Sequence, residues 1–506
     1  MDTIPGALRA AAASYADHPA YVESGTTLTF AELLDRVRRT AATYVGWGLA
    51  PGQRIGLWAP NSIDWVVAGL AISYAGGTLV PLNSRYTAYE VADILDRTEA
   101  KIVVVADGFL GRSQIEELTG VGTTALVVDL ADLAVRTVGA DDLARADVRA
   151  VAVSPDDIAD ILFTSGTTGR SKGVLTAHRQ TIAAAEVWGA TGRVSADDRY
   201  LVISPFFHSY GYKVGLVTGL LTGATIHPMA TFDPAVTLKL IESERISVVP
   251  GAPAIFQALL DHPDFATTDV SSLRFANTGA ANVPVALVER MQKDLSFELV
   301  LTAFGMTECC VATMCRPGDA DDLVATTCGR AVDGLELRIA DPRSGAVLSA
   351  GEEGEVQLRG PMVMLGYLDD AEATAEAIDA DGWLHTGDVG VLDAEGYLRI
   401  TDRLKDMYIC GGFNVYPAEV EQLLARLEGV ADVAVVGVPD ERLGEVGKAF
   451  VVRRDGAALE ADDVIAFARE RLANFKAPRS VEFVTALPRN LAGKVLKNQL
   501  RGASGG

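Results

Sequence analysis

The run Ile161-Leu-Phe-Thr-Ser-Gly-Thr-Thr-Gly-Arg-Ser-Lys-Gly173 decides how this chain of 506 residues folds. An apolar strand passes into a loop of glycine, serine and threonine with one lysine, and a helix-like segment follows from about His178. Glycines let backbone N–H groups point at a polyphosphate, hydroxyls add donors, and Lys172 adds positive charge. The loop is not a Walker A loop, because Ser171 precedes the lysine and Gly173 follows it. The pattern predicts a phosphate-binding loop at the end of a core strand.

Apolar runs typical of strands alternate with helix-like segments on both sides of this loop. The predicted elements include strands at 54–58, 102–105, 158–164 and 273–278 and helices at 89–98, 234–244 and 284–294. Such alternation predicts parallel sheets covered by helices. After about residue 330 the runs are shorter and are joined by Gly and Asp turns, which predicts a more antiparallel region and then a compact α+β stretch. We place a domain boundary at residues 401–403.

The composition is that of a globular protein with an acidic excess. Lys and Arg number 44 against 67 Asp and Glu, so the formal net charge is −23, and 22% of residues are charged. This charge repels phosphates at long range and argues against nucleic acid as a partner, whereas a few local cations suffice for a small anionic ligand.

The sequence also bears on compartment. Two uncharged windows, residues 65–84 and 214–232, are broken by Gly, Pro, Ser or Thr, so we expect buried helix–strand pairs there and no integral membrane contact. The five cysteines fit neither a disulfide scaffold nor a zinc pattern, and no signal peptide is visible. We therefore expect free thiols and a cytoplasmic location.

The segment 164–174 resembles the nucleotide loop of the acyl- and aryl-CoA synthetases, the luciferases and the adenylation domains of peptide synthetases. Further stretches resemble motifs of this adenylate-forming superfamily in the same order, so the resemblance spans residues 164–494. They are Pro205-Phe-Phe-His-Ser-Tyr-Gly211, Thr278-Gly-Ala-Ala281, Phe304-Gly-Met-Thr-Glu308, Gly382-Trp-Leu-His-Thr-Gly-Asp388, Ile400-Thr-Asp-Arg-Leu-Lys-Asp406 and Pro488-Arg-Asn-Leu-Ala-Gly-Lys494.

The resemblance implies an α/β fold with two domains. Residues 1–401 would form a large AMP-binding domain of helix-covered sheets that includes a small β-barrel-like subdomain. Residues 402–506 would form a small mobile α+β lid that swings about a hinge at Asp402 between two half-reactions.

The resemblance also implies an AMP-forming acid–thiol ligase, a reaction in two steps. A carboxylate attacks the α-phosphorus of ATP, which gives an acyl-adenylate and pyrophosphate, and a thiol then attacks the adenylate carbonyl as AMP leaves. Both steps need charge stabilisation around phosphate and no activated protein nucleophile. No carrier domain follows Lys494 in the sequence, so we expect free coenzyme A as the acceptor, with ATP and Mg²⁺ as the other cofactors.

The matched motifs imply residue roles. Thr164 and Glu308 are the expected Mg²⁺ contacts, because one hydroxyl and one carboxylate leave room for water and phosphate oxygens. Phe304 would lie beside the adenine, Asp388 would accept hydrogen bonds from the ribose hydroxyls, and Arg403 would bridge ribose and phosphate. The expected catalytic residues are Lys494, Thr307, Glu308 and Lys172, and the remaining cofactor contacts are Ser165, Gly166, Thr167, Thr168, Gly169, Gly279, Ala280, Ala281, Gly411 and Gly412.

Fewer residues indicate the identity of the acid substrate than indicate the nucleotide site. His208 stands where the superfamily places a wall of the acyl pocket, with Tyr210, Met306 and Cys309 as expected neighbours. No acidic residue lies in 205–211, which disfavours an amino acid and favours an apolar or alicyclic acid. Longer stretches such as 403–417 resemble an actinobacterial branch whose CoA ligase activates the propanoate of the steroid C/D-ring fragment, a methylhexahydroindanedione.

Alternatives stay open at this point. The acid could instead be a medium- or long-chain fatty acid or an aryl acid, and a non-catalytic acyl or nucleotide sensor on the same fold is an alternative of another class. The presence of Lys494 and Glu308 favours the enzyme. Further partner expectations are a homodimer and a lysine acetyltransferase, which would remove the charge of Lys494.

Overall fold

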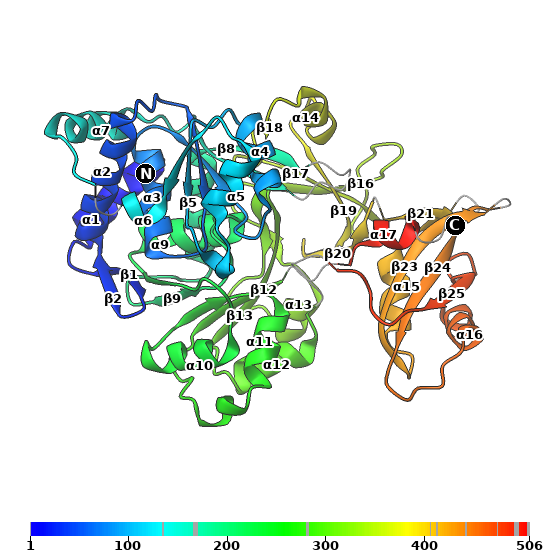
Figure 1. The fold of residues 1–506 in the computed structure, drawn as a ribbon. Helices are drawn as coiled ribbons and strands as arrows, with labels where there is room; N and C mark the ends of the chain where they lie inside the picture. The colour runs from blue at the N-terminus through cyan, green and yellow to red at the C-terminus, as the bar shows by residue number, and fades with distance from the viewer. Residues whose placement is uncertain are drawn as a thin grey trace. The chain divides into compact units, whose positions relative to one another are not determined.

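The structure, a computed structural model, describes residues 2–133, 136–164, 171–279, 283–404, 406–410, 413–440, 443–472, 474–489 and 495–502, without the side chains of residues 403, 413, 414 and 502. The chain forms two compact units (Figure 1). The first comprises Met1–Glu336 and Leu358–Leu384, and the second comprises Leu337–Gln357 and His385–Gly506. The second unit therefore includes strands that precede residue 401, whereas the predicted hinge at Asp402 concerns motion and stays a prediction.

A seven-stranded sheet in the first unit carries the predicted phosphate loop. Its order is β18 (Gly366–Tyr367), β8 (Lys172–Ala177), β7 (Ile158–Thr164), β4 (Thr78–Leu82), β3 (Arg54–Trp58), β5 (Ile102–Val105) and β6 (Leu126–Asp129). The strands from β7 to β6 are parallel, and β8 and β18 are added antiparallel. Buried parallel strands are apolar along their whole length, as in β4 and β5, where every residue is buried.

A nine-stranded sheet forms the other layer of strands in this unit. Its order is β15 (Arg330–Ala331), β14 (Cys309–Met314), β13 (Leu299–Met306), β12 (Phe275–Gly279), β11 (Val248–Pro250), β9 (Arg199–Val202), β10 (Thr225–Pro228), β1 (Pro19–Glu23) and β2 (Thr26–Thr29). The strands from β13 to β1 are parallel, so the carboxyl ends of β12 and β13 lie side by side. In open α/β sheets ligands bind at such ends.

Helices cover both sheets (Figure 1). Helix α3 (Ile63–Tyr74) packs against both β4 and β1, which belong to different sheets, and all its residues except Asp64 are buried. The other helices of this unit are α1 (Ile4–Ser14), α2 (Phe30–Gly46), α4 (Ala88–Arg97), η1 (Phe109–Gly111), α5 (Gln114–Val121), α6 (Leu130–Leu133), α7 (Ala140–Ala152), α8 (His178–Thr191), the π-helix η2 (Tyr210–Val217), α9 (Thr218–Thr222), α10 (Pro234–Ser243), α11 (Pro253–Leu260), η3 (Pro263–Thr267), α12 (Val285–Lys293), α13 (Asp321–Thr326) and α14 (Ala371–Ala377).

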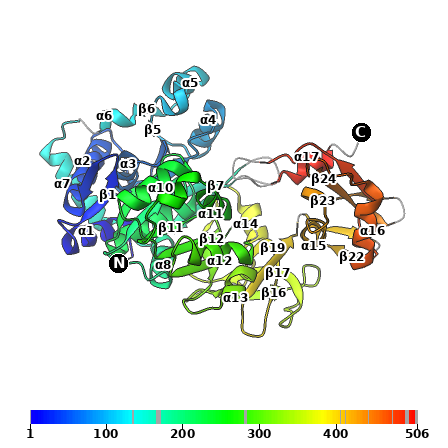
Figure 2. The ribbon, with the colours of Figure 1, turned by 90° about the horizontal axis from the view of Figure 1, so that it is seen from below.

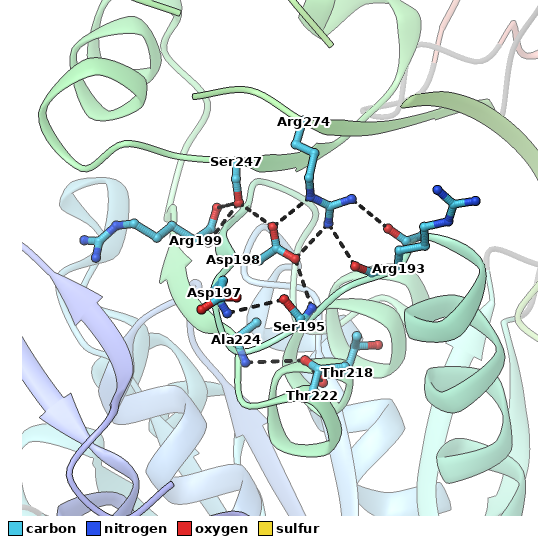
Figure 3. Close-up of polar contacts among 11 residues, drawn as sticks. Arg193, Ser195, Asp197, Asp198, Arg199, Thr218, Thr222, Ala224, Ser247 and Arg274 are labelled. Carbon is cyan, nitrogen blue, oxygen red and sulfur yellow. Dashed lines mark hydrogen bonds and ion pairs between the residues drawn. The ribbon is translucent and has the colours of Figure 1, made fainter. Parts of the chain in front are cut away.

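A buried ion pair ties together the amino ends of three strands of the nine-stranded sheet (Figure 3). The Asp198 carboxylate accepts hydrogen bonds from Arg274 Nε at 3.1 Å and from its terminal nitrogen at 2.7 Å, and from the Ser247 hydroxyl at 2.8 Å. Asp198, Ser247 and Arg274 immediately precede β9, β11 and β12. Arg274 also donates to the carbonyl oxygens of Gly192 and Arg193 beyond α8, so one carboxylate organises this whole edge.

Replacing Asp198 by alanine is expected to lower the free energy of unfolding by about 3 kcal/mol, because it leaves the Arg274 guanidinium partly buried without its carboxylate. Melting curves should show a fall of about 5 °C. The control is Asp35→Ala, which breaks an exposed pair with Arg39 on α2 and is expected to change the free energy of unfolding by no more than about 0.5 kcal/mol. Equal effects of the two substitutions would contradict the argument.

The second unit contains two smaller sheets. The four-stranded sheet has the order β16 (Glu336–Ala340), β17 (Glu353–Arg359), β19 (Leu384–Leu392) and β20 (Leu398–Arg403), seen side by side in part in Figure 2. The five-stranded sheet contains β22 (Phe413–Val415), β21 (Tyr408–Cys410), β24 (Gly444–Arg453) and β23 (Val430–Asp440) in that order, with β25 (Ser480–Phe483) parallel to β24. Its helices are α15 (Pro417–Leu424), α16 (Ala461–Arg471) and α17 (Lys497–Gly502).

Most predicted elements are confirmed, and two expectations need correction. Strands β3, β5 and β7 begin and end as predicted, and both uncharged windows contain a buried helix followed by a strand. The β-barrel-like subdomain is wrong: β16 and β20 are the two edges of an open sheet, and no barrel closes among the described residues. Strand β8 was also not predicted. Among the described helices, none combines the length and hydropathy that a membrane crossing requires.

Candidate functional site

The predicted phosphate loop lies in the sequence between β7 and β8, two antiparallel strands that pair with each other. Thr164 ends β7 and lies directly opposite Lys172, the first residue of β8, and the Thr164 hydroxyl donates to the Lys172 carbonyl oxygen at 3.4 Å. The helix expected from about His178 is confirmed as α8, which begins at His178, and β8, which pairs with both β7 and β18, precedes it. The predicted loop residues Ser165, Gly166, Thr167, Thr168 and Gly169 lie outside the described residues.

Two predicted site residues, Lys172 and Glu308, meet at a third side chain that the sequence analysis missed. The Tyr367 hydroxyl donates a hydrogen bond to Glu308 Oε1 at 2.9 Å. Lys172 Nζ lies 4.8 Å from the centroid of the Tyr367 ring, within cation–π range. The structure therefore brings together the phosphate-loop lysine and the predicted Mg²⁺ carboxylate.

Glu308 and Thr307 form the turn of the hairpin between β13 and β14. Met306 pairs with Cys309 across this turn, and the register shifts between Phe304 and Met306. A Cβ atom at Gly305 would lie 2.0 Å from the Cys310 carbonyl oxygen, so only glycine permits this tight return of the chain. Glu308 is 8% exposed and lies between two strands.

The predicted adenine contacts lie at the carboxyl ends of β12 and β13. Gly279 ends β12 and pairs with Ala303, whose carbonyl oxygen would be 3.0 Å from a Cβ atom at Gly279. Phe304 follows in β13, is partly buried and pairs with Thr313. Ala280 and Ala281 lie outside the described residues.

One of the predicted acyl-pocket residues, Tyr210, belongs to an aromatic pair with the buried Trp188. Tyr210 packs edge-on against Trp188, with ring centroids 5.2 Å apart, and donates its hydroxyl hydrogen to Asn277 Oδ1 at 2.6 Å. The backbone N–H of Tyr210 donates to Nδ1 of the exposed His208 at 3.2 Å, which leaves Nε2 to carry the proton of the neutral ring. Cys309 is fully buried, whereas Met306 is partly buried.

The Cys310 thiol and a buried lysine were not assigned roles from sequence. Cys310 is partly buried, and burial raises the pKa of its thiol to about 11, so it stays protonated. Lys213 Nζ lies 3.1 Å from Asp160 Oδ1, and the two side chains are 2% and 0% exposed. This ion pair joins η2, which begins at Tyr210, to β7, which ends at Thr164. A lone lysine in an otherwise uncharged apolar run was the signal for it in the sequence.

The predicted ribose carboxylate, Asp388, belongs to the second unit. It is buried in β19 and lies directly opposite Arg403 of β20. Its backbone N–H donates to the Thr386 hydroxyl at 3.1 Å, and that hydroxyl donates to the Val356 carbonyl oxygen. Glu355 accepts a hydrogen bond from the Gly387 N–H at 3.3 Å. These bonds fix the backbone that carries Asp388.

The predicted hinge residue has a defined contact within the second unit. Asp402 Oδ2 accepts a hydrogen bond from the Ala418 N–H at 2.7 Å, at the first turn of α15, where a carboxylate also interacts favourably with the helix dipole. The predicted residues Gly411, Gly412 and Lys494 lie outside the described residues, as does the Arg403 side chain.

The donor set near Glu308 fits magnesium and no metal held by several protein acids. Within the described residues no group of three or more His, Cys, Asp or Glu could hold a metal ion. Glu308 Oε1 is engaged by Tyr367, and in the described part of the chain Oε2 has no hydrogen-bond partner. One carboxylate oxygen with water and phosphate oxygens is a coordination that Mg²⁺ accepts.

Known proteins resemble this chain along its whole length. The family described as "AMP-binding enzyme" matches residues 8–368, and the family described as "AMP-binding enzyme C-terminal domain" matches residues 419–494. The chain is 55% identical to the 3-[(3aS,4S,7aS)-7a-methyl-1,5-dioxo-octahydro-1H-inden-4-yl]propanoyl:CoA ligase of Rhodococcus jostii, over 99% of this chain and 98% of that protein. It is 56% identical to the ligase of the same name from Mycobacterium tuberculosis, over 99% of each.

A solved structure extends the likeness to the fold. ATP-bound MatB from Rhodopseudomonas palustris is 32% identical, with a TM-score of 0.85, over 99% of this chain and 98% of that one.

Proposed function

From the premise that this chain belongs to the AMP-binding enzyme family, in which it is an AMP-forming acyl-CoA synthetase that uses ATP and coenzyme A, we propose that its acid is the methylhexahydroindanedione propanoate of steroid breakdown. The observation that carries this proposal is the 55–56% identity, over nearly the full length, to two ligases named for that acid.

The proposed adenylation step uses groups of the first unit together with Lys494, which belongs to the second. An oxygen of the acid's carboxylate bonds to the α-phosphorus as the bond to the pyrophosphate oxygen breaks, and pyrophosphate leaves with the bonding electrons. Lys172 binds the departing phosphates, while Thr307 and Lys494 hold α-phosphate oxygens. A magnesium ion on Glu308 and Thr164 would neutralise phosphate charge.

The proposed second step uses the second unit. Asp388 holds the ribose of the adenylate, and the thiol of coenzyme A, guided by Gly411 and Gly412, attacks the acyl carbonyl. The carbonyl–phosphate bond breaks, AMP leaves, and the thiol proton passes to solvent. Between the two steps, movement of residues 402–506 about Asp402 would withdraw Lys494 from the acyl-adenylate and allow the thiol of coenzyme A to approach it.

The acyl side favours a rigid, mainly apolar ring system with few polar atoms. The partly buried Tyr210 packs against the fully buried Trp188, and the exposed His208 lies next to Tyr210. The buried Asn277 Nδ2 has no hydrogen-bond partner among the described residues, and a ring ketone is an acceptor that such a donor requires.

A panel of carboxylates tests this proposal. Acid-dependent pyrophosphate release and CoA consumption are measured with the indanedione propanoate, medium- and long-chain fatty acids, and aryl acids. We expect kcat/KM for the indanedione propanoate to exceed the others by about 100-fold, because its two ketones and fused rings each contribute contacts that the others lack. Similar rates for all acids would contradict the substrate assignment, and no acid-dependent release with any of them would favour a sensor.

Further proposals follow from the resemblance alone. They are a homodimer, a cytoplasmic location, and control by an acetyltransferase acting on Lys494, which would block adenylation by removing the ammonium charge. Acetylation that leaves pyrophosphate release unchanged would contradict the last of these.

A further inference from the structure

We propose that Tyr367 is a positioning residue that aligns the carboxylate of Glu308 and the ammonium of Lys172 for magnesium-bound ATP. The inference rests on the proposed roles of those two residues and adds a third that no motif assigned. One phenol contacts both: its hydroxyl hydrogen-bonds Glu308 Oε1 at 2.9 Å, and its ring faces Lys172 Nζ at 4.8 Å.

Several hydrogen bonds fix the backbone around Tyr367, and they therefore fix the position from which its side chain extends. Strand β18 pairs with β8, with Tyr367 opposite Val174, and the Leu368 N–H donates to the Gly173 carbonyl oxygen at 2.8 Å. The Tyr367 N–H donates to the Thr374 hydroxyl at 2.9 Å. Gly366 has a φ of +148°, and a Cβ atom there would lie 2.8 Å from Thr374 Cγ2, so this approach requires glycine.

The same segment also reaches the turn that carries the carboxylate. The Met364 N–H donates to the Glu308 carbonyl oxygen at 2.8 Å. Residues 364–368 are therefore bonded to β8, which begins at Lys172, and to the turn at Glu308. These two parts of the site come from different sheets, and β18 joins them.

At Glu308 the phenol decides which carboxylate oxygen is available. The hydrogen bond occupies Oε1 and restrains rotation of the carboxylate, which leaves Oε2 for a cation. A tyrosine phenol is ordinarily protonated at neutral pH, so the Tyr367 hydroxyl serves as a donor to the Glu308 carboxylate.

At Lys172 the phenol ring holds the ammonium group without the competing negative charge that a carboxylate would bring. Within the described residues no Asp or Glu lies within ion-pair distance of Lys172. A cation–π contact holds the ammonium weakly, so arriving phosphates displace the ring at little cost, whereas a salt bridge would compete with them. The ring thus holds Lys172 Nζ in place and leaves its positive charge available to a phosphate.

The test compares Tyr367→Phe with a matched tyrosine elsewhere. Tyr367→Phe keeps the ring and removes only the hydroxyl, so we expect the Mg²⁺ concentration for half-maximal adenylation and the KM for ATP to rise about tenfold. Conversion of preformed acyl-adenylate and CoA to thioester should stay within about twofold. Tyr367→Leu, which removes the ring as well, should lower kcat/KM for adenylation by about 100-fold.

The control is Tyr74→Phe. Tyr74 is a residue of α3, and its hydroxyl also donates to a carboxylate oxygen, Asp147 Oδ1, at 2.8 Å. Its Mg²⁺ dependence should match wild type even if its melting temperature falls. The inference is overturned if Tyr367→Phe keeps the wild-type Mg²⁺ dependence, or if it lowers both half-reactions equally as a folding defect would. If Glu308→Gln and Lys172→Ala retain full adenylation, the proposed roles of those residues fail instead.

Discussion

Replacement of Lys494 by alanine is expected to abolish acyl-adenylate formation while sparing the second half-reaction. In the proposed mechanism the ammonium neutralises charge that develops on carboxylate and α-phosphate oxygens only while the phosphorus is attacked. A preorganised cation in that position contributes about 10³-fold, so pyrophosphate release should fall by about that factor. Thioester formation from purified acyl-adenylate and CoA should stay within about twofold of wild type.

Lys497 provides the control for this substitution. It lies three residues further along the chain and its Nζ is 2.8 Å from Glu421 Oε1, so it has a structural partner within the second unit. Lys497→Ala should leave both half-reactions within about twofold of wild type and lower only stability, because it breaks a partly buried pair. If Lys494→Ala reduced both half-reactions equally, the model of two conformations would be wrong for this chain.

Periodicity and turn residues were sufficient for the buried strands of the first unit. Strands β3, β5 and β7 are mostly apolar runs, with Arg54 at the start of β3 and Asp160 within β7, and such runs are typical of parallel strands between helices. Strand β8, Lys172–Ala177, escaped prediction because it begins within the glycine-rich run, and one of its two partners, β18, comes from a distant part of the chain. The barrel expectation failed because sheet closure depends on the pairing of edge strands, which sequence pattern does not contain.

The individual site residues could be predicted where they belong to a sequence motif, whereas contacts between residues of different motifs could not. Lys172 and Glu308 were each assigned from local sequence, and the structure places both against Tyr367. Tyr367 itself follows a glycine in a short strand and has no local pattern that indicates chemistry. The contact of Glu355 with the Gly387 backbone could not be predicted from local sequence either, because the two residues are 32 positions apart.

The net charge of −23 and the three proposed anionic ligands are compatible because the compensation is local. Most described arginines of the first unit are ion-paired, as Arg38 is to Asp147 and Arg274 to Asp198. Lys172 faces an aromatic ring and has no described carboxylate partner, so its charge is available to a phosphate. Acidic groups elsewhere repel polyanionic surfaces at long range but contribute little at the loop, since exposed charges are screened over about 8 Å.

Replacement of Glu308 by glutamine is expected to reduce adenylation by about 100-fold or more, with a shift to higher Mg²⁺ concentration. Glutamine keeps the shape of the side chain and an oxygen acceptor for the Tyr367 hydroxyl, so the turn between β13 and β14 should remain intact and melting should change little. The lost negative charge removes the protein's carboxylate ligand for a cation that also needs phosphate oxygens. The measurement is a Mg²⁺ titration of pyrophosphate release at saturating ATP and acid.

Glu244 supplies the control for charge removal as such, because it is ion-paired with Arg199 at 2.6 Å and lies on the edge at the amino ends of the strands. Glu244→Gln should have the wild-type titration curve. Asp388→Asn, in the second unit, supplies the contrast. In the proposed mechanism Asp388 holds the ribose, which belongs to both ATP and the acyl-adenylate, so this substitution should weaken both half-reactions, whereas Glu308→Gln should affect the first. A Glu308→Gln enzyme with an unchanged Mg²⁺ titration would place the metal on other residues, and equal losses in both half-reactions would mean that Glu308 acts on the nucleotide or the fold and not through the cation.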